Sequence, residues 1–322
     1  MTSGREDSAE RSPGVRPVTT PELALWSETV PYERLVQSEV LRPLAARGIG
    51  LRVAVWPHSL RAIPDVVRAC RDADVHLCLW PMLEDADGRW GSSHNAARYC
   101  AFASRLAREL GGAALLPDEL AFDLEPPLGA LRRALGGRPT LGLFGRGAAA
   151  TERLFAASVA ELAAAGLPVR VAAMPLVALG GSRLWQRLFG TPVDGPAFAR
   201  VDAMLYSSLF EGYTRGLVGR ASALALVHAL SRWHRSRHGP RAAVSLGCTG
   251  PGALGDERPY RSVDELALDA GAARAAGIRE LALFDLGGAL ARPPLEAWLD
   301  ALAPTHAPTP TRPARSVAAR HL

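Results

Sequence analysis

Eight short apolar runs recur along the chain, and residues with helical spacing follow each of them. The runs cover residues 23–28, 51–57, 75–81, 120–125, 169–174, 203–207, 242–247 and 281–285. Strands that alternate with helices form parallel sheets covered by helices. Eight such units predict a closed (β/α)8 barrel. The alternative is an open doubly wound sheet, which needs a glycine-rich turn after its first strand. The sequence has Trp26-Ser27-Glu28-Thr29 at that position.

The barrel is expected to span residues 21–303 as one domain, because no internal repeat or second apolar pattern interrupts the alternation. Residues 1–20 and 304–322 are polar and rich in Pro, Thr, Ser and Arg, with no periodicity. Such segments cannot bury enough apolar surface to fold. We therefore expect both ends to be disordered.

The chain contains no lysine, so all 37 basic residues are arginines. This excludes Schiff-base chemistry and a Walker A phosphate loop, since both require lysine. The sequence pI is about 9.4, but the arginines are scattered and form no basic run interleaved with aromatic residues. A solvated surface is favoured over a nucleic-acid interface.

No apolar stretch is long enough to cross a membrane, and the first residues show no signal sequence. The four cysteines lack CxxC spacing, which is typical of free thiols in a reducing compartment. We expect a cytoplasmic protein that binds neither membrane nor nucleic acid. The sequence indicates no oligomeric state.

Aromatic and polar side chains gather where the predicted strands end, and these ends form the active site of a (β/α)8 barrel. Trp26, Trp56 and Trp80 end three consecutive strands. Indole rings suit the flat apolar faces of sugars, whose hydroxyls need polar partners. The candidate polar partners at or just after strand ends are Glu28, His58, Glu84, Glu211 and Asp285. Together these residues predict a mouth that binds a carbohydrate or glycoside.

The fourth run ends in two carboxylates, Asp123 and Glu125, which lie two residues apart. Side chains two apart on a strand share a face, so the pair is expected to point the same way. A carboxyl group beside a second carboxylate in apolar surroundings has a raised pKa. Such a group can protonate a glycosidic oxygen near neutral pH.

This stretch resembles the D-x-x-D-x-D-x-E signature of glycoside hydrolase family 18, the chitinase and endo-N-acetylglucosaminidase barrels. Asp118, Asp123 and Glu125 occupy three of its four acidic positions, and Ala121 occupies the fourth. Met204-Leu205-Tyr206 is similar to the family's M-x-Y. The resemblance implies that Glu125 is the general acid and that Asp123 orients an N-acetyl group. It also implies that Tyr206 hydrogen-bonds the attacking acetamido group and that no cofactor is needed.

We therefore expect a retaining glycoside hydrolase, and three alternatives stay open. In a two-carboxylate glycosidase, Glu28, Glu211 or Asp285 would act as nucleophile or base beside Glu125. A metal-dependent sugar isomerase or hydrolase would bind a divalent ion through carboxylates and one histidine, namely Glu28, His58, Asp85, Glu125 and Asp285. A barrel that binds a carbohydrate without cleaving it is the third alternative, because a fold alone does not fix a function.

Overall fold

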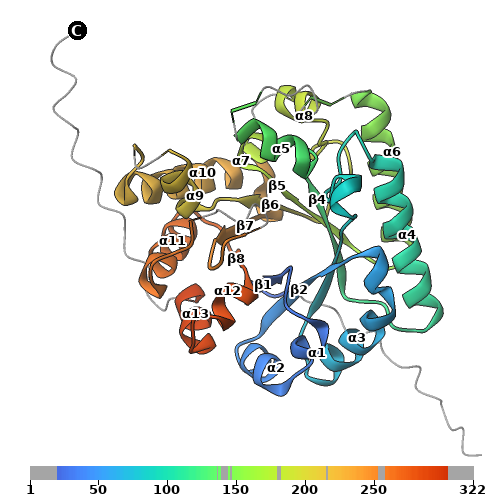
Figure 1. Ribbon diagram of the computed structural model, residues 1–322, viewed down its shortest axis with the longest axis horizontal. Helices are drawn as coiled ribbons and strands as arrows, with labels where there is room; N and C mark the ends of the chain where they lie inside the picture. Colours follow the sequence, from blue (N-terminus) through green and yellow to red (C-terminus); the bar gives the residue numbers. More distant parts are fainter. Residues whose placement is uncertain are drawn as a thin grey trace, which may run out of the picture.

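The computed structural model describes residues 20–135, 137–138, 144–145, 147–179, 183–214, 217–252 and 258–303. The two ends predicted to be disordered lie outside these residues, apart from Thr20. Eight parallel strands close into one barrel in chain order, with helices around it (Figure 1). The predicted (β/α)8 barrel is confirmed.

All eight predicted strands are present, with ends that differ from the predicted ones by up to three residues. They are β1 (Leu23–Ser27), β2 (Ile49–Val55), β3 (Leu77–Pro81), β4 (Glu119–Leu124), β5 (Val169–Ala173), β6 (Arg200–Met204), β7 (Ala242–Gly247) and β8 (Glu280–Phe284). The last strand pairs with the first in parallel, with Leu23 opposite Leu281, and this pairing closes the barrel.

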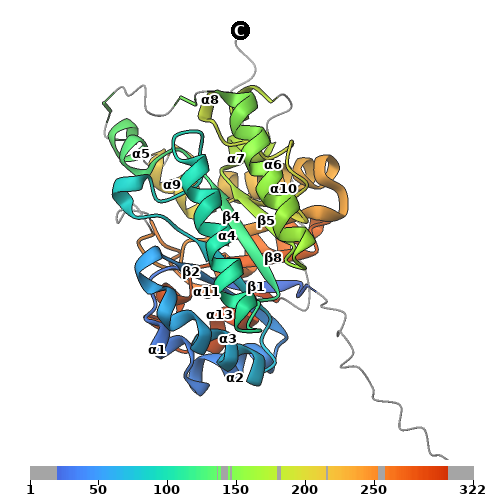
Figure 2. The ribbon, with the colours of Figure 1, turned by 90° about the vertical axis from the view of Figure 1, so that its right-hand side faces the viewer.

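Helices follow the strands around the outside of the barrel. Within the described residues they are α1 (Tyr32–Leu35), α2 (Ser38–Ala45), α3 (Ile63–Asp72), α4 (Ala96–Gly112), α5 (Leu128–Leu135), α6 (Ala148–Ala164), α7 (Pro175–Leu179), α8 (Leu184–Phe189), α9 (Ser207–Tyr213), α10 (Arg220–His238), α11 (Val263–Ala275), α12 (Leu286–Leu290) and α13 (Leu295–Leu302), with short 3-10 turns η1 (Pro57–Ala62), η2 (Asp85–Asp87) and η4 (Gly239–Arg241). Helices α4 and α6 lie side by side along the barrel (Figure 2).

Two helix predictions were incomplete. The segment from Tyr32 to Ala46 was expected to form one helix, but Gln37 is extended, with ψ 144°, and divides it into α1 and α2. Helices α7, α9 and α12 follow their strands almost at once and were not predicted. They contain five to seven residues, which is too short for an amphipathic period to show in the sequence.

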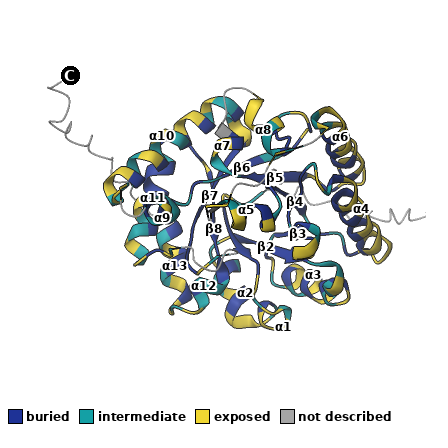
Figure 3. Cartoon of the chain, turned by 45° about the horizontal axis from the view of Figure 1, so that its top comes forward, coloured by how far each residue is buried: buried dark blue, intermediate teal, exposed yellow. Residues whose placement is uncertain are grey.

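The alternating side chains of the strands build two cores. Outward residues such as Leu25, Leu51 and Val171 pack against the helices. Inward residues form a second cluster, which includes Trp26, Trp80 and Phe284. In Figure 3 the strands are buried, and the yellow exposed surface lies on the helices around them.

Charged residues fill the inside of the barrel near the first residues of several strands. Arg170 donates to Glu119 at 2.6 Å and to Asp202 at 2.9 Å. Arg52 donates to Asp202 at 3.0 Å and to Glu280 at 2.7 Å. Each of these side chains is buried. Buried charges persist only when they are paired, so this network is a structural layer beneath the mouth.

Candidate active site

Asp123 and Glu125 lie at the end of β4 and are buried, with 3% and 8% of their surfaces exposed. The two carboxyl groups are joined by a hydrogen bond. Burial first, and then the nearby charges of Glu125 and Glu28, raise the pKa of Asp123 well above its ordinary value. Burial of the pair therefore favours its protonated form. This geometry confirms that the two side chains point the same way.

The strand end that carries this pair is fixed by its neighbours. The backbone N–H of Asp123 donates to the hydroxyl oxygen of Tyr99 on α4 at 3.1 Å. The carbonyl of Asp123 accepts from Gly91 at 2.8 Å. Gly91 belongs to the loop between β3 and α4, so this loop is attached directly to the end of β4 and brings its side chains to the mouth.

Glu28 follows β1 and faces the same space, because its charge acts on Asp123. It is 5% exposed. Burial raises its pKa to about 7, against the lowering effect of Arg89 and with a further rise from Asp285. The guanidinium of Arg89 makes an ion pair with Glu28 and a second one with Asp85 at 2.7 Å.

Trp26 and Trp80 pack edge to face beneath the carboxylates, with ring centroids 5.0 Å apart. The indole Nε1 of Trp26 donates to Ser245 Oγ at 2.9 Å. In contrast, Trp80 Nε1 and Asp123 Oδ1 are buried and have no hydrogen-bond partner among the described residues. A buried donor and a buried acceptor without partners are costly.

Other aromatic side chains complete the inward cluster. Tyr206 lies after β6, where it precedes α9, and stacks on Phe284 at 5.7 Å. Trp56 is half-buried and also packs against the cluster. Leu128 and Leu131 of α5 contact the same cluster, and α5 lies in front of the barrel centre in Figure 3. The mouth therefore has an aromatic floor and is covered by α5.

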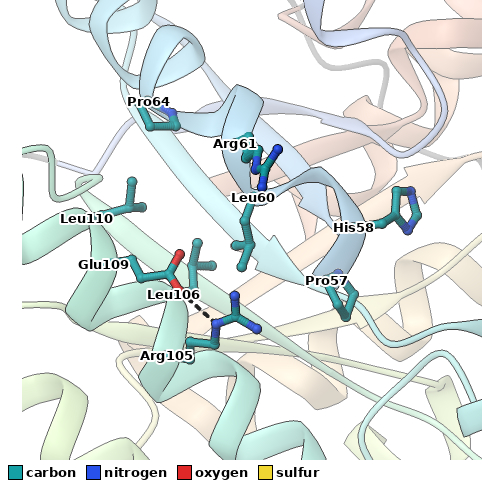
Figure 4. A pocket seen from close by; sticks show the side chains of 9 residues that line it. All are labelled: Pro57, His58, Leu60, Arg61, Pro64, Arg105, Leu106, Glu109 and Leu110. Carbon is teal, nitrogen blue, oxygen red and sulfur yellow. Dashed lines mark hydrogen bonds and ion pairs between the residues drawn. The ribbon is translucent and has the colours of Figure 1, made fainter.

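Two predicted polar residues, His58 and Glu84, lie at the surface. They hydrogen-bond to each other at 2.6 Å, and their side chains are 68% and 48% exposed. His58 also lines a groove of about 570 Å³ outside the barrel (Figure 4). The residues of this groove come from η1, α3 and α4 and are Pro57, His58, Leu60, Arg61, Pro64, Arg105, Leu106, Glu109 and Leu110.

The other two predicted acids have partners of their own. Glu211 on α9 is held by Arg261 at 3.1 Å and by Arg220 at 3.4 Å. Asp285 accepts a hydrogen bond from the backbone of Gly288 at 3.0 Å and so caps α12. Glu211 thus joins α9 to α10 and to Arg261, and Asp285 fixes the first turn of its own helix, which gives both carboxylates a structural role.

The five side chains of the metal alternative do not converge, because His58 turns to Glu84 and Asp85 pairs with Arg89. Across the described part of the chain, no three His, Cys, Asp or Glu side chains are grouped so that they could hold a metal ion. No helix in this part is long and apolar enough to cross a membrane.

Sequence reasoning missed Arg89. Its backbone is left-handed, with φ 64°, and its position depends on an ion pair to Glu28, 61 residues earlier in the chain. The weak signal in the sequence is its place between Gly88 and Trp90 in a polar loop. Trp90 is buried in the inward cluster.

No protein-family model matches the sequence, and no curated protein matches it. The fold is similar to the PgaB (BpsB) glycoside hydrolase domain from Bordetella bronchiseptica, with a TM-score of 0.55 and 11% identity over 88% of this chain and 99% of that one.

Two further structures have similar folds. A GH5-4 broad specificity endoglucanase from Ruminococcus champanellensis has a TM-score of 0.53 and 13% identity over 83% of this chain and 85% of its own. A family 5 xyloglucanase from Paenibacillus pabuli has a TM-score of 0.52 and 12% identity over 83% and 89%. At these identities the comparisons show the barrel fold alone. Membership of family 18 stays a prediction.

Proposed function

We propose that the protein is a glycoside hydrolase in which Glu125 is the general acid. The observation that carries this proposal is the buried, hydrogen-bonded pair of Asp123 and Glu125 at the strand ends of the barrel. A carboxyl pair that retains a proton at neutral pH can deliver it to a glycosidic oxygen as the bond to the anomeric carbon breaks. The glycoside hydrolases among the structures of similar fold support this choice.

In the first form of the reaction, the substrate carries an N-acetyl group. Its acetamido oxygen bonds to the anomeric carbon while Glu125 gives its proton to the leaving oxygen, and water later opens the intermediate as Glu125 takes a proton back. Asp123 would orient the acetamido group, and Tyr206 would hydrogen-bond to it. The free Oδ1 of Asp123 and the free Nε1 of Trp80 offer an acceptor and a donor for this group.

In the second form, Glu28 supplies a second enzymic carboxylate. Glu28, Glu211 and Asp285 were the candidates for this role. Of the three, Glu28 acts on the pKa of Asp123, while Glu211 is held by arginines and Asp285 caps a helix. A carboxylate at this position can attack the sugar or activate water.

The test is the turnover of aryl N-acetylglucosaminides and aryl glucosides by the wild type, Glu125→Gln and Glu39→Gln. Glu39 is an exposed acid on α2 and serves as the matched control. Loss of a general acid typically costs 10²- to 10⁴-fold, so Glu125→Gln should be at least about 100-fold slower while Glu39→Gln keeps wild-type rates. Hydrolysis confined to N-acetylated substrates would select the first form.

Binding measurements separate the enzyme from a carbohydrate-binding barrel. Calorimetry with the same sugars should show that Glu125→Gln still binds what the wild type cleaves. A wild type that binds the sugars but hydrolyses none of them would contradict the proposal and favour a binding protein.

A further inference from the structure

We propose that Arg89 is the positioning residue of this site and holds Glu28 facing Asp123 and Glu125, as a second carboxylate that can ionise near neutral pH. This inference rests on the proposed function and adds a residue that the chemistry of the strand ends alone does not supply. Its ion pair is with Glu28, and its charge also lowers the pKa of Asp123 against the larger effect of burial.

The guanidinium of Arg89 is shared between two carboxylates. One of its terminal nitrogens donates to Glu28 Oε1, and its Nε donates to Asp85 Oδ1 at 2.7 Å. Glu28 is almost fully buried, whereas the carboxylate of Asp85 is half exposed. Asp85 therefore fixes the outer edge of the guanidinium, and the inner edge is directed to Glu28.

The loop backbone fixes Arg89 as firmly as its side chain does. Its carbonyl accepts from Leu83 N at 2.8 Å, and its own N–H donates to Glu84 O at 3.2 Å. These bonds close the η2 turn around a left-handed residue with φ 64°. A residue other than glycine in this conformation carries a cost, and the two ion pairs of Arg89 offset it.

The charges around Glu28 come from every side of the mouth. Asp285 faces it from the end of β8, Asp123 from β4 and Asp85 from η2. On α5, Arg132 lies 3.9 Å from Asp85, so its charge acts on Asp85 and not on Glu28 directly. Among the described residues, Arg89 is the cation that pairs with Glu28.

Removing the guanidinium would leave Glu28 buried and facing three carboxyl groups. Desolvation and like charges both favour the protonated form of a carboxyl group. A protonated Glu28 can neither attack an anomeric carbon nor accept a proton from water. With Arg89 in place, Glu28 can serve as a base or nucleophile beside the pair of Asp123 and Glu125. Without Arg89, only the pair remains able to take part in catalysis.

The first experiment measures the ionisation of Glu28 without using activity. Protein labelled with ¹³C at the glutamate carboxyl carbon is titrated by NMR, and Glu28→Gln identifies the Glu28 signal. We expect Arg89→Gln to move the Glu28 midpoint up by at least about one pH unit, which is a tenfold loss of the ionised form below the midpoint. Arg89→Lys keeps a positive charge, so its Glu28 midpoint should lie close to that of the wild type. Arg98→Gln, which removes an ion pair to Asp87 in the same loop, should cause none.

The second experiment follows kcat/KM against pH for the same variants. If Glu28 works as an ionised carboxylate, the acidic limb of the Arg89→Gln profile moves up with the NMR midpoint, and Arg89→Lys brings it back. Thermal unfolding verifies that each variant is folded, and Arg89→Met, which also removes the charge, carries the comparison if Arg89→Gln is not.

The outcomes separate this inference from the proposed function. An unchanged midpoint in Arg89→Gln overturns the role of Arg89. A shifted midpoint with an unshifted acidic limb overturns the role of Glu28 while glycoside hydrolysis stands. A shifted midpoint in a protein that hydrolyses no glycoside supports the hold of Arg89 on Glu28 and contradicts the proposed function.

Discussion

Arg170 Nη1 and Asp202 Oδ2 lie 2.9 Å apart inside the barrel, on the neighbouring strands β5 and β6. Asp202 also accepts from Arg52 on β2 at 3.0 Å, so cations from two directions hold one buried carboxylate. Burial alone would raise the pKa of Asp202, but the two guanidiniums outweigh burial and lower it. The inside of such barrels is commonly filled by branched apolar side chains, and here an ion network occupies the part of that volume near the first residues of the strands.

Arg170→Leu should strongly destabilise the protein. The change leaves Glu119 without its partner and removes one of the two cations on Asp202. Breaking a buried ion network costs about 3 to 5 kcal/mol, because the remaining charges stay buried. Urea unfolding measures the free energy. Arg68→Leu removes an exposed pair to Asp65 and should change it by less than about 1 kcal/mol. Equal losses in both variants would contradict the structural role of the network.

Glu28→Gln should change how stability depends on pH. The pKa of Glu28 is raised from 4.5 to about 7 in the folded state, so the folded protein binds a proton that the unfolded chain has released. Stability therefore falls as the pH rises from about 4.5 to about 7. Glutamine does not titrate, so the variant lacks this loss. The difference in unfolding free energy, variant minus wild type, should therefore rise by about 3 kcal/mol from pH 4 to pH 8. Unfolding at both pH values measures the gain, and Glu39→Gln should show none.

Trp26→Phe should cost more stability than Trp80→Phe, although both remove the same atoms from the same cluster. Trp26→Phe removes the hydrogen bond to Ser245 and weakens the contact with the guanidinium of Arg52, which lies 4.8 Å from the Trp26 ring centroid. Trp80 loses an N–H that has no partner among the described residues. The difference is expected to be about 1 to 2 kcal/mol in chemical denaturation. A larger loss in Trp80→Phe would mean that its N–H is satisfied in solution.

The fold could be predicted because most strand residues form apolar runs. The first residues of several strands belong to the buried ion network and are charged, so the starts of those strands were predicted too late. β7 contains a continuous apolar run and was predicted at its observed bounds, Ala242–Gly247. β6 was predicted to begin at Ala203 and begins at Arg200. Arg200 and Asp202 lie before the predicted start, and in the structure Asp202 lies inside the barrel with Arg52 and Arg170. A local pattern does not reveal that a distant Arg170 will pair with it.

Some residues of the candidate site could likewise be predicted from local sequence, and others depend on contacts between distant residues. The shared direction of Asp123 and Glu125 follows from the two-residue period of a strand, which is local information. The position of Arg89 follows from ion pairs to Glu28, 61 residues earlier in the chain, and from a left-handed turn. His58 and Glu84 were chosen because they follow strands. Their side chains instead lie at the surface and pair with each other, and this direction depends on tertiary packing.

Tyr99→Phe should weaken the end of β4 without disturbing the packing around it. The Tyr99 ring packs edge to face on Phe122, with centroids 5.3 Å apart, and phenylalanine retains this contact. The backbone N–H of Asp123 loses the hydroxyl that accepts from it at 3.1 Å. A buried donor without a partner costs about 1 to 3 kcal/mol, and the unfolding free energy should fall by that amount. Amide hydrogen exchange at Asp123 should also become faster than at Phe122. If the exchange at Asp123 is unchanged, Tyr99 does not fix the strand end, and the carboxyl pair is held by β4 and Gly91 alone.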